Sequence, residues 1–481
     1  MRTSLALLAA GLGLRLALLV GGFGDYVASR IEVSTLGNGV LSIREGVALL
    51  ATGTSPYTGS PCYAPPLVLA GAGALAGRGG HLAAAVPFVA ADAAAALLLR
   101  TVARHAALEA RRFAPPGGGR RADGNGGGAA ASVGEDVLVA LYLFNPLTLA
   151  ACVGCTTTCL ESAAVVGAVA GAATGSAWSA AACVAVGAYL GLHPLLLLVS
   201  LAVLMLNRRP SSLHAAPSLG AILAAWAGLA ARTAACLLVL AAASDAVLAA
   251  AGHPGDACLP LTWRYVRAAG AATDAGGGAG RGGREDWGGW GGGGGGGGGC
   301  WAVHVYSLPL LFTDQTPNIG QWWYLFAQVF AAQRPFFCFT AHALCALFAL
   351  PSAVRFPRQG TLLVVLQTGI NTMLRPYPSV GDLGLYLTLL ATIGARLAGS
   401  GLGLLLSNSL LLLGVLAPAM WAQWIGAESA NSNFFYSITL LLGVWHTLVL
   451  VQLVLVSAQL GHECKEEAVG GGQGGNKDKR E

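Results

Sequence analysis

Residues 429–458 read SANSNFFYSITLLLGVWHTLVLVQLVLVSA. From Asn433 onwards this stretch contains no Asp, Glu, Lys or Arg, and a helix needs about 20 apolar residues to cross a bilayer. Similar apolar runs recur from one end of the chain to the other. Because a chain in lipid must satisfy its backbone hydrogen bonds internally, we expect an all-α, polytopic membrane protein.

The composition agrees with this class. The chain has 481 residues, of which 55% are hydrophobic and only 10% charged, whereas soluble domains carry about 25% charged residues. The formal net charge of +5 is modest, and the basic residues cluster between apolar runs. This pattern is typical of membrane topology and argues against nucleic acid as a partner. The 11 cysteines lie mostly in apolar runs and indicate no secreted disulfide framework.

The apolar runs predict about 12 transmembrane helices in one integral membrane domain, 1–481. The expected spans are 4–20, 82–99, 135–153, 158–174, 177–191, 194–207, 232–251, 335–354, 360–374, 382–397, 402–420 and 433–458. Residues 65–77 are apolar but too few to cross, so we expect an interfacial helix there. Residues 213–231 have an amphipathic pattern and are expected on the membrane surface.

The arginines predict the orientation. Six of them fall in the Arg/Gly-rich loop 100–134, which we therefore place in the cytosol. Both termini, including the tail 460–481, are then cytosolic, and the loop 252–334 is luminal. Its glycine-rich insert, 275–299, cannot build a packed core and is expected to be disordered.

Uncharged polar and aromatic residues gather in four segments, all on the expected luminal side. These are 55–67, 314–330, 375–382 and 429–436. Each places Pro, Gly or Asn beside aromatic residues, and the aromatic pattern of QWWYLFAQVF suits an interfacial helix. An ordinary aromatic belt with capped helix ends is the alternative for any one segment. The aromatic-belt explanation is weaker for the four segments taken together, because a belt needs no asparagines.

The sequence offers little that indicates catalysis or a metal. It has no G-x-S-x-G or HExxH motif, and CVGCTTTC (152–159) favours helix packing by small residues over metal binding. We therefore expect no catalytic residue, metal or cofactor. Three acids fall inside expected spans, namely Asp92, Glu161 and Asp245. Such residues are functional candidates, although a structural partner is an equally good explanation for each.

Several motifs resemble one family closely. SPYTG, FNPLT, TPNIGQWWY, RPYPSVGDLGLY and SANSNFFYSITL occur in this order, and they resemble the PIG-U family, a subunit of the GPI transamidase. The resemblance runs from about Arg15 to Gln459 and excludes the two glycine-rich inserts, which depart from the family pattern.

The resemblance implies a multi-pass protein of the endoplasmic reticulum membrane, with a fold like the GT-C glycosyltransferases. It implies a non-catalytic subunit that binds and presents the glycosylphosphatidylinositol (GPI) lipid for attachment to proprotein C-termini and scaffolds the complex. The implied partners are the GPI glycolipid, membrane lipid and the other subunits: a caspase-like cysteine protease, which supplies the nucleophile, and the PIG-T, PIG-S and GPI anchor attachment protein types.

The alternative is an active GT-C lipid-linked mannosyltransferase of GPI assembly. Such an enzyme needs a luminal carboxylate, commonly in an Asp-x-Asp pair. In the first luminal segment Asp25 and Glu32 are seven residues apart, and no such pair occurs. This favours a scaffold that binds a glycolipid without transferring sugar. A transporter or channel remains a further possibility.

The luminal segments supply the candidate binding residues for the GPI headgroup. Amides donate and accept hydrogen bonds, which suits a hydroxyl-rich ligand, so Asn431 and Asn433 are the first candidates. Helix capping is the alternative role for them. We expect Phe434, Phe435 and Tyr436 beside the acyl chains. The neighbouring segments add Asp382, Tyr377, Asn318, Trp322 and Trp323.

Overall fold

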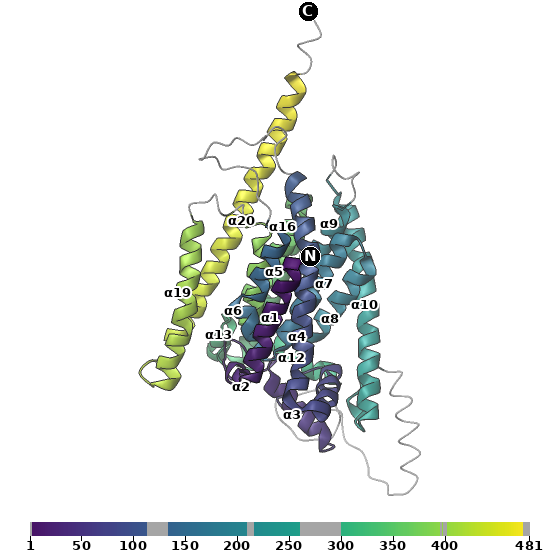
Figure 1. The fold of residues 1–481 in the computed structure, drawn as a ribbon, viewed down its shortest axis with the longest axis vertical. Helices are drawn as coiled ribbons and strands as arrows, with labels where there is room; N and C mark the ends of the chain where they lie inside the picture. Colours follow the sequence, from purple (N-terminus) through teal and green to yellow (C-terminus); the bar gives the residue numbers. More distant parts are fainter. Residues whose placement is uncertain are drawn as a thin grey trace, which may run out of the picture.

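The structure is a computed structural model that describes residues 2–112, 133–208, 216–259, 300–394, 397 and 402–474. Within these ranges every regular element is helical, which confirms the all-α fold class. Most of the helices stand side by side as one upright bundle (Figure 1). The antiparallel helices α19 (Gly403–Trp421) and α20 (Ser432–Gly474) lie along one flank of it.

The helices of the first half are α1 (Arg2–Val20), α2 (Phe23–Ala28), α3 (Val40–Ala51), α4 (Pro66–Arg112), α5 (Glu135–Leu143), α6 (Pro146–Val153), α7 (Thr157–Thr174), α8 (Ala177–Leu190), η1 (His193–Leu197), α9 (Leu198–Leu206) and α10 (Leu219–Ala250). Those of the second half, besides α19 and α20, are η3 (Pro254–Asp256), α12 (Trp301–Leu311), α13 (Trp322–Gln328), η4 (Ala331–Gln333), α14 (Arg334–Leu347), α15 (Ala349–Arg355), α16 (Gly360–Leu374), α17 (Val380–Ala391) and η5 (Ala422–Gly426).

Several helices are long and apolar enough to cross a membrane. Among the described residues there are six, namely Leu82–Arg111, Thr157–Thr174, Leu219–Ala250, Ala331–Arg355, Gly403–Gly426 and Ser432–Leu460. The pair α5 and α6, bent by 52°, makes a seventh, and further apolar helices of 10–17 residues pack among them. The polytopic fold is thus confirmed, whereas the count of 12 spans and the likeness to GT-C enzymes remain predictions.

Helix α4 differs from the expected pattern. It joins the segments 65–77 and 82–99, with only Gly80 at a positive φ of 65° between them. It then continues through Arg112, so the first part of the expected loop 100–134 is helical. Glu135 explains the continuation, because its carboxylate accepts from Arg100 Nε at 3.2 Å and from Arg104 Nε at 2.6 Å. Residues 113–132 lie outside the described residues.

Helix α10 also corrects an expectation. Residues 219–250 form one helix, so the supposed surface segment 213–231 and the span 232–251 are not separate. Arg232, the first residue of the expected span, is accommodated within the helix. Its Nη1 donates to the Gly228 carbonyl at 2.7 Å, and its guanidinium lies over the Trp178 ring at 5.6 Å.

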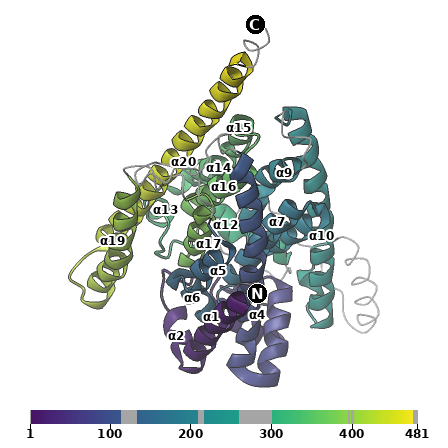
Figure 2. The same ribbon diagram turned by 45° about the horizontal axis from the view of Figure 1, so that its top comes forward.

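The centre of the bundle depends on small residues. Helix α7 packs against α4 and α8 with nearly all its side chains buried, and its turns lie within the bundle in both ribbon views (Figure 2). At Gly171 an added Cβ would lie 2.7 Å from the Ala180 backbone nitrogen. Close backbone approach of this kind is how helices associate where lipid provides no hydrophobic drive.

The described part of the loop 252–334 contains two helices: α13 lies where the pattern of QWWYLFAQVF predicted a helix, whereas α12 was not expected. A disulfide joins Cys258 to Cys300, 42 residues apart, and the insert 275–299 falls between them, outside the described residues. The sequence analysis did not anticipate this bond.

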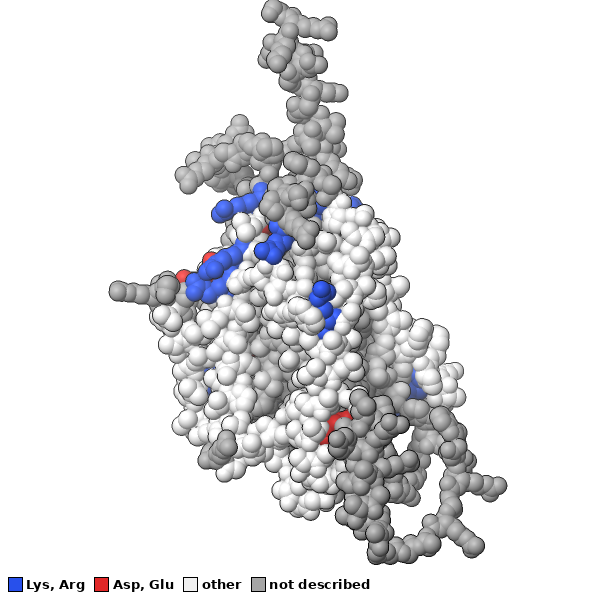
Figure 3. Space-filling view, turned by 90° about the vertical axis from the view of Figure 1, so that its right-hand side faces the viewer, with Lys and Arg blue, Asp and Glu red and all other residues white. Residues whose placement is uncertain are grey.

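The charged residues are distributed unevenly over the surface. Lys and Arg gather towards one end of the visible face, and its middle is nearly uncharged (Figure 3).

Candidate functional site

The start of α20 carries the first group of predicted site residues. Asn431 precedes the helix, and its Oδ1 accepts from the Asn433 backbone N–H at 3.0 Å. This bond is a helix cap, so the capping role considered for Asn431 is present. The Oδ1 of Asn433 accepts from the Tyr324 hydroxyl of α13. Both asparagines nevertheless remain exposed.

Below the asparagines lies an aromatic cluster formed by α13, the end of α19, η5 and α20. Tyr436 stacks on Tyr324 with ring centroids 4.5 Å apart, and its hydroxyl donates to the Gln321 carbonyl at 3.2 Å. Phe435 is fully buried, 5.4 Å from Trp421. Phe434 is 51% exposed and faces outward. Of the three residues expected beside acyl chains, Phe434 is therefore the one that can meet lipid directly.

The two tryptophans of α13 have different roles. Trp322 Nε1 donates to the Leu374 carbonyl at 2.7 Å, which ties α13 to the end of α16. Trp323 packs against Trp424 at 6.3 Å, and its buried Nε1 has no hydrogen-bond partner among the described residues. A buried donor without a partner is costly, so this indole N–H is the unsatisfied group of the aromatic cluster.

The remaining predicted residues hold the neighbouring turns together. Asn318 is buried and its Oδ1 accepts from the Gly320 N–H at 2.7 Å. Only glycine fits at position 320, because an added Cβ would lie 2.8 Å from Pro378 Cδ. The Tyr377 hydroxyl donates to the Asp314 carbonyl at 2.8 Å. Segments 314–330 and 375–382 therefore pack directly against each other.

Asp382 is a structural acid at the start of α17. Its Oδ2 accepts from Ser379 N and Oγ, at 2.8 and 3.1 Å, and completes a capping box. Its Oδ1 accepts from Arg375. The same guanidinium reaches Glu161 of α7, with Nη1 and Nη2 at 3.3 and 3.2 Å from the two carboxylate oxygens. Burial opposes the charge of Arg375, but Asp382 and Glu161 raise its pKa above the ordinary value.

Beside this triad is a small polar cavity of about 50 Å³, which the sequence analysis did not foresee. Its polar lining includes Asn38, Tyr63, Glu161, His193, Arg375 and Tyr377. His193 begins η1, and its buried Nδ1 has no hydrogen-bond partner among the described residues. Glu161 had been singled out as an acid in a span, but its partners come from segments too distant in sequence to be recognised.

A larger cavity of about 700 Å³ lies between α3, α4, α7, α8 and α10. Its lining is mostly apolar, with Arg44 as a charged exception. Helix α10 and the α19–α20 pair occupy opposite flanks of the bundle (Figure 1). This cavity is therefore separate from the cluster at the start of α20.

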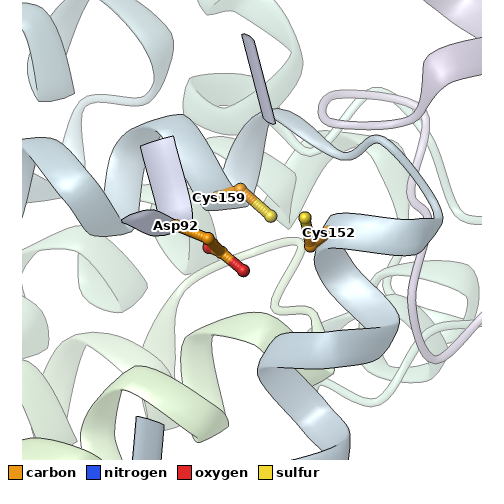
Figure 4. A group of neighbouring side chains, drawn as sticks. All are labelled: Asp92, Cys152 and Cys159. Atoms are coloured by element: carbon orange, nitrogen blue, oxygen red, sulfur yellow. The ribbon is translucent and has the colours of Figure 1, made fainter. Parts of the chain in front are cut away.

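Three side chains of metal-ligand type also meet inside the bundle. Asp92, Cys152 and Cys159 are buried with their ligand atoms within 4.8 Å of one another, and the two thiols face each other (Figure 4). The carboxylate is already engaged, because Oδ2 accepts from Arg15 Nε at 2.7 Å and Oδ1 accepts from the Tyr142 hydroxyl at 2.8 Å. Structural zinc sites use four ligands, so this geometry favours packing around an ion pair.

Comparison with known proteins adds the family context. A family model described as "GPI transamidase subunit PIG-U" matches residues 9–252 and 297–442 of this chain. The gap between the two matched parts, 253–296, covers most of the glycine-rich insert.

Individual relatives match over shorter stretches. The "GPI transamidase component GAB1 homolog" of Schizosaccharomyces pombe is 31% identical over 157 residues, which are 32% of this chain and 38% of that protein. The "GPI-anchor transamidase component PIGU" of Homo sapiens is 32% identical over 146 residues, 30% of this chain and 34% of the relative. The "GPI transamidase component GAB1" of Saccharomyces cerevisiae is 32% identical over 149 residues, 31% and 38% of the two chains. Each match thus spans a little over a third of the curated relative.

Proposed function

This chain belongs to the PIG-U family of GPI transamidase subunits, and on that basis we propose that it is a non-catalytic membrane subunit of the transamidase. In this role it binds the GPI lipid, presents it for attachment to proprotein C-termini and scaffolds the complex. Its relatives are named as components of the same complex.

The observation that carries the glycolipid proposal is the meeting of α13 with the first turn of α20. Tyr324 bonds to Asn433, and Tyr436 bonds to the Gln321 carbonyl, so two motifs more than 100 residues apart form one surface. Exposed amides lie above buried aromatic rings there. Such a surface suits a ligand with hydroxyl groups at one end and hydrocarbon at the other.

The acids of the first luminal segment support the non-catalytic role over mannosyl transfer. Asp25 forms an ion pair with Arg44 at 2.8 Å, and Glu32 forms one with Arg30 at 3.1 Å. Each carboxylate therefore has its own arginine, and the pairs do not create the joint acidic site that a cation-dependent transferase uses.

We further propose the endoplasmic reticulum membrane as the location, with both termini and the tail 460–481 cytosolic and 252–334 luminal. The basic end of the molecule supports the cytosolic side (Figure 3). The Cys258–Cys300 disulfide supports an oxidising lumen for 252–334. The proposed partners are the caspase-like protease, PIG-T, PIG-S and GPI anchor attachment protein types of subunit.

The test is the double change Asn431→Ala, Asn433→Ala in cells that lack the native subunit. Each neutral hydrogen bond contributes about 0.5–1.5 kcal/mol, so we expect glycolipid binding to weaken roughly five- to hundredfold. Surface GPI-anchored protein should fall while the partner subunits still co-purify. Normal anchoring would end the binding proposal.

Two control variants separate binding from structure. Asn431→Asp keeps the Oδ1 acceptor that caps α20 but removes the amide, so it should lose anchoring if the amide binds ligand and keep it if only the cap matters. Tyr324→Phe removes the hydrogen bond to Asn433 without changing either asparagine. If it reproduces the double variant, that internal bond explains the effect and the proposal is wrong.

A further inference from the structure

The polar cavity beside Arg375 is built by segments from across the chain. Asn38 and Tyr63 come from the segment between α2 and α4, Glu161 from α7 and His193 from η1, and Arg375 from the turn before α17. Gly191 keeps the space open, because a Cβ added there would lie 3.1 Å from Glu161 Oε2 and 3.4 Å from Arg375 Nη2. The cavity is therefore a feature of the fold and not a packing defect.

The charges around the cavity do not balance. Arg375 is shared between two carboxylates, those of Glu161 and Asp382, so the triad carries a formal charge of −1 when both acids are ionised. Asp382 is further stabilised by Ser379 and the N-terminus of α17. Glu161 has only the two bonds from Arg375 among the described contacts, and its side chain is 11% exposed. A buried charge without full compensation is unfavourable, so a cation next to Glu161 would stabilise the site.

His193 and the size of the cavity determine which kind of cation fits there. His193 Nδ1 has no partner among the described residues and becomes an acceptor when the proton is on Nε2. It lines the same cavity as the Glu161 carboxylate. A volume of about 50 Å³ corresponds to one to two water molecules at about 30 Å³ each. This admits an ammonium group with its first carbon atom but excludes a sugar ring.

We propose that the cavity formed by Glu161, His193 and Arg375 binds a primary ammonium group carried by a lipid headgroup. The ammonium donates to the Glu161 carboxylate and to His193 Nδ1, and its charge neutralises the triad. This proposal is independent of glycolipid binding at the start of α20, because it uses none of the residues placed there.

The test uses the full chain purified in detergent and ethylammonium chloride as the probe. Ligand binding to the folded state raises the thermal unfolding midpoint. The midpoint of the wild type should rise with ethylammonium, and Glu161→Gln should shift the required concentration at least tenfold upward. Because the substitution also removes the uncompensated charge, the unliganded variant should unfold at the same temperature as wild type or higher. A marked loss of stability without ligand would overturn the proposal and make Glu161 purely structural.

Matched controls exclude other causes. Glu135→Gln removes another carboxylate that bridges two arginines, remote from the cavity, and should leave the response unchanged. Sodium chloride at equal ionic strength and tetramethylammonium, which has no N–H donor, should not reproduce the effect. An equal response to sodium would assign the cavity to an inorganic cation and overturn the proposal. Gly191→Ala, which narrows the cavity without changing charge, should also weaken the response.

The source of the ammonium group is identified with lipids. Vesicles of phosphatidylcholine with added phosphatidylethanolamine test a bilayer lipid, and the same vesicles with an amine-bearing glycolipid test a specific ligand. Whichever lipid competes with ethylammonium in wild type but not in Glu161→Gln is the source. Competition by neither would overturn the headgroup assignment, and would leave the Asn431 and Asn433 test unaffected.

Discussion

Breaking the Arg15–Asp92 ion pair should destabilise the bundle more than removing both charges together. Arg15 is fully buried, and its Nε donates to Asp92 Oδ2 at 2.7 Å. Its Nη1 also donates to the carbonyls of Gly11 and Leu143, at 3.1 and 2.7 Å. Asp92→Leu therefore leaves a buried cation with two neutral acceptors, and Arg15→Met leaves a buried carboxylate that keeps the hydrogen bond from the Tyr142 hydroxyl.

The expected magnitude follows from these contacts. Removing one partner of a buried pair costs about 3–5 kcal/mol, because the other charge stays buried. Asp92→Leu should fall at the lower end of this range, since the guanidinium keeps two carbonyl acceptors. The double variant leaves the Tyr142 hydroxyl unsatisfied, which costs about 1–3 kcal/mol. In a membrane the unfolded state also finds polar partners, which reduces all these values but preserves their order.

The assay is the thermal midpoint of the detergent-solubilised full chain, followed as the monodisperse fraction in size-exclusion chromatography. Both single variants should lose folded protein at lower temperature than wild type, and Arg15→Met, Asp92→Leu together should recover most of the loss. Glu135→Gln is the control. It breaks a pair in which the Arg104 side chain is 59% exposed, and because exposed pairs contribute only about 0–1 kcal/mol, its midpoint should stay close to that of wild type. If the thermal midpoint of the double variant is no higher than that of the less stable single variant, the argument is refuted.

Three further outcomes are expected. Burial lowers the pKa of His304, which stacks on Tyr63 at 4.8 Å, so the stability it contributes is present above about pH 6.5 and falls as the pH decreases; the hydrogen-exchange protection factors around Tyr63, which correct for the pH dependence of intrinsic exchange, should fall at pH 5, and less so in His304→Phe. Deleting 275–299 should leave assembly and surface GPI-anchored protein unchanged, and loss of assembly would show that the insert is a contact. Asp245→Ala should destabilise the junction around the Cys258–Cys300 disulfide, because the Asp245 carboxylate accepts from Trp301 Nε1 at 2.9 Å. The rate of proteolysis next to Cys258 should rise, and an unchanged rate would contradict this.

The sequence predicts the helices well, because a chain in lipid must satisfy its backbone hydrogen bonds internally. The length and hydrophobicity of a segment are therefore nearly enough to predict that it is a helix. Each segment expected as a span is helical over most of its length in the described residues. The corrected boundaries lie beside arginines that the helices accommodate. Arg232 lies inside α10, where it donates to the Gly228 carbonyl and lies over the Trp178 ring, and Arg100 lies inside α4, where it pairs with Glu135.

The site was predictable as a set of segments but not as a set of contacts. The motifs singled out 314–330, 375–382 and 429–436, and α13, the turn before α17 and the start of α20 do pack close together. The pairing of Arg375 with Glu161 joins residues 214 apart, and no local pattern records it. The same holds for the Cys258–Cys300 bond, whose two cysteines carry no motif.

Glu161 and Asp245 show why contacts have to decide between structure and function. In the sequence both are single acids within apolar runs. Asp245 accepts from Cys258 N, Leu259 N and Trp301 Nε1, so its charge is stabilised by hydrogen bonds from donors that flank the disulfide, and its role in holding that junction is explained. Glu161 shares one cation with Asp382 and faces a cavity in which His193 Nδ1 also lacks a partner. A charged group deep in a membrane protein is retained at a cost. The charge of Glu161 is incompletely compensated, so a bound ligand explains why this acid is present.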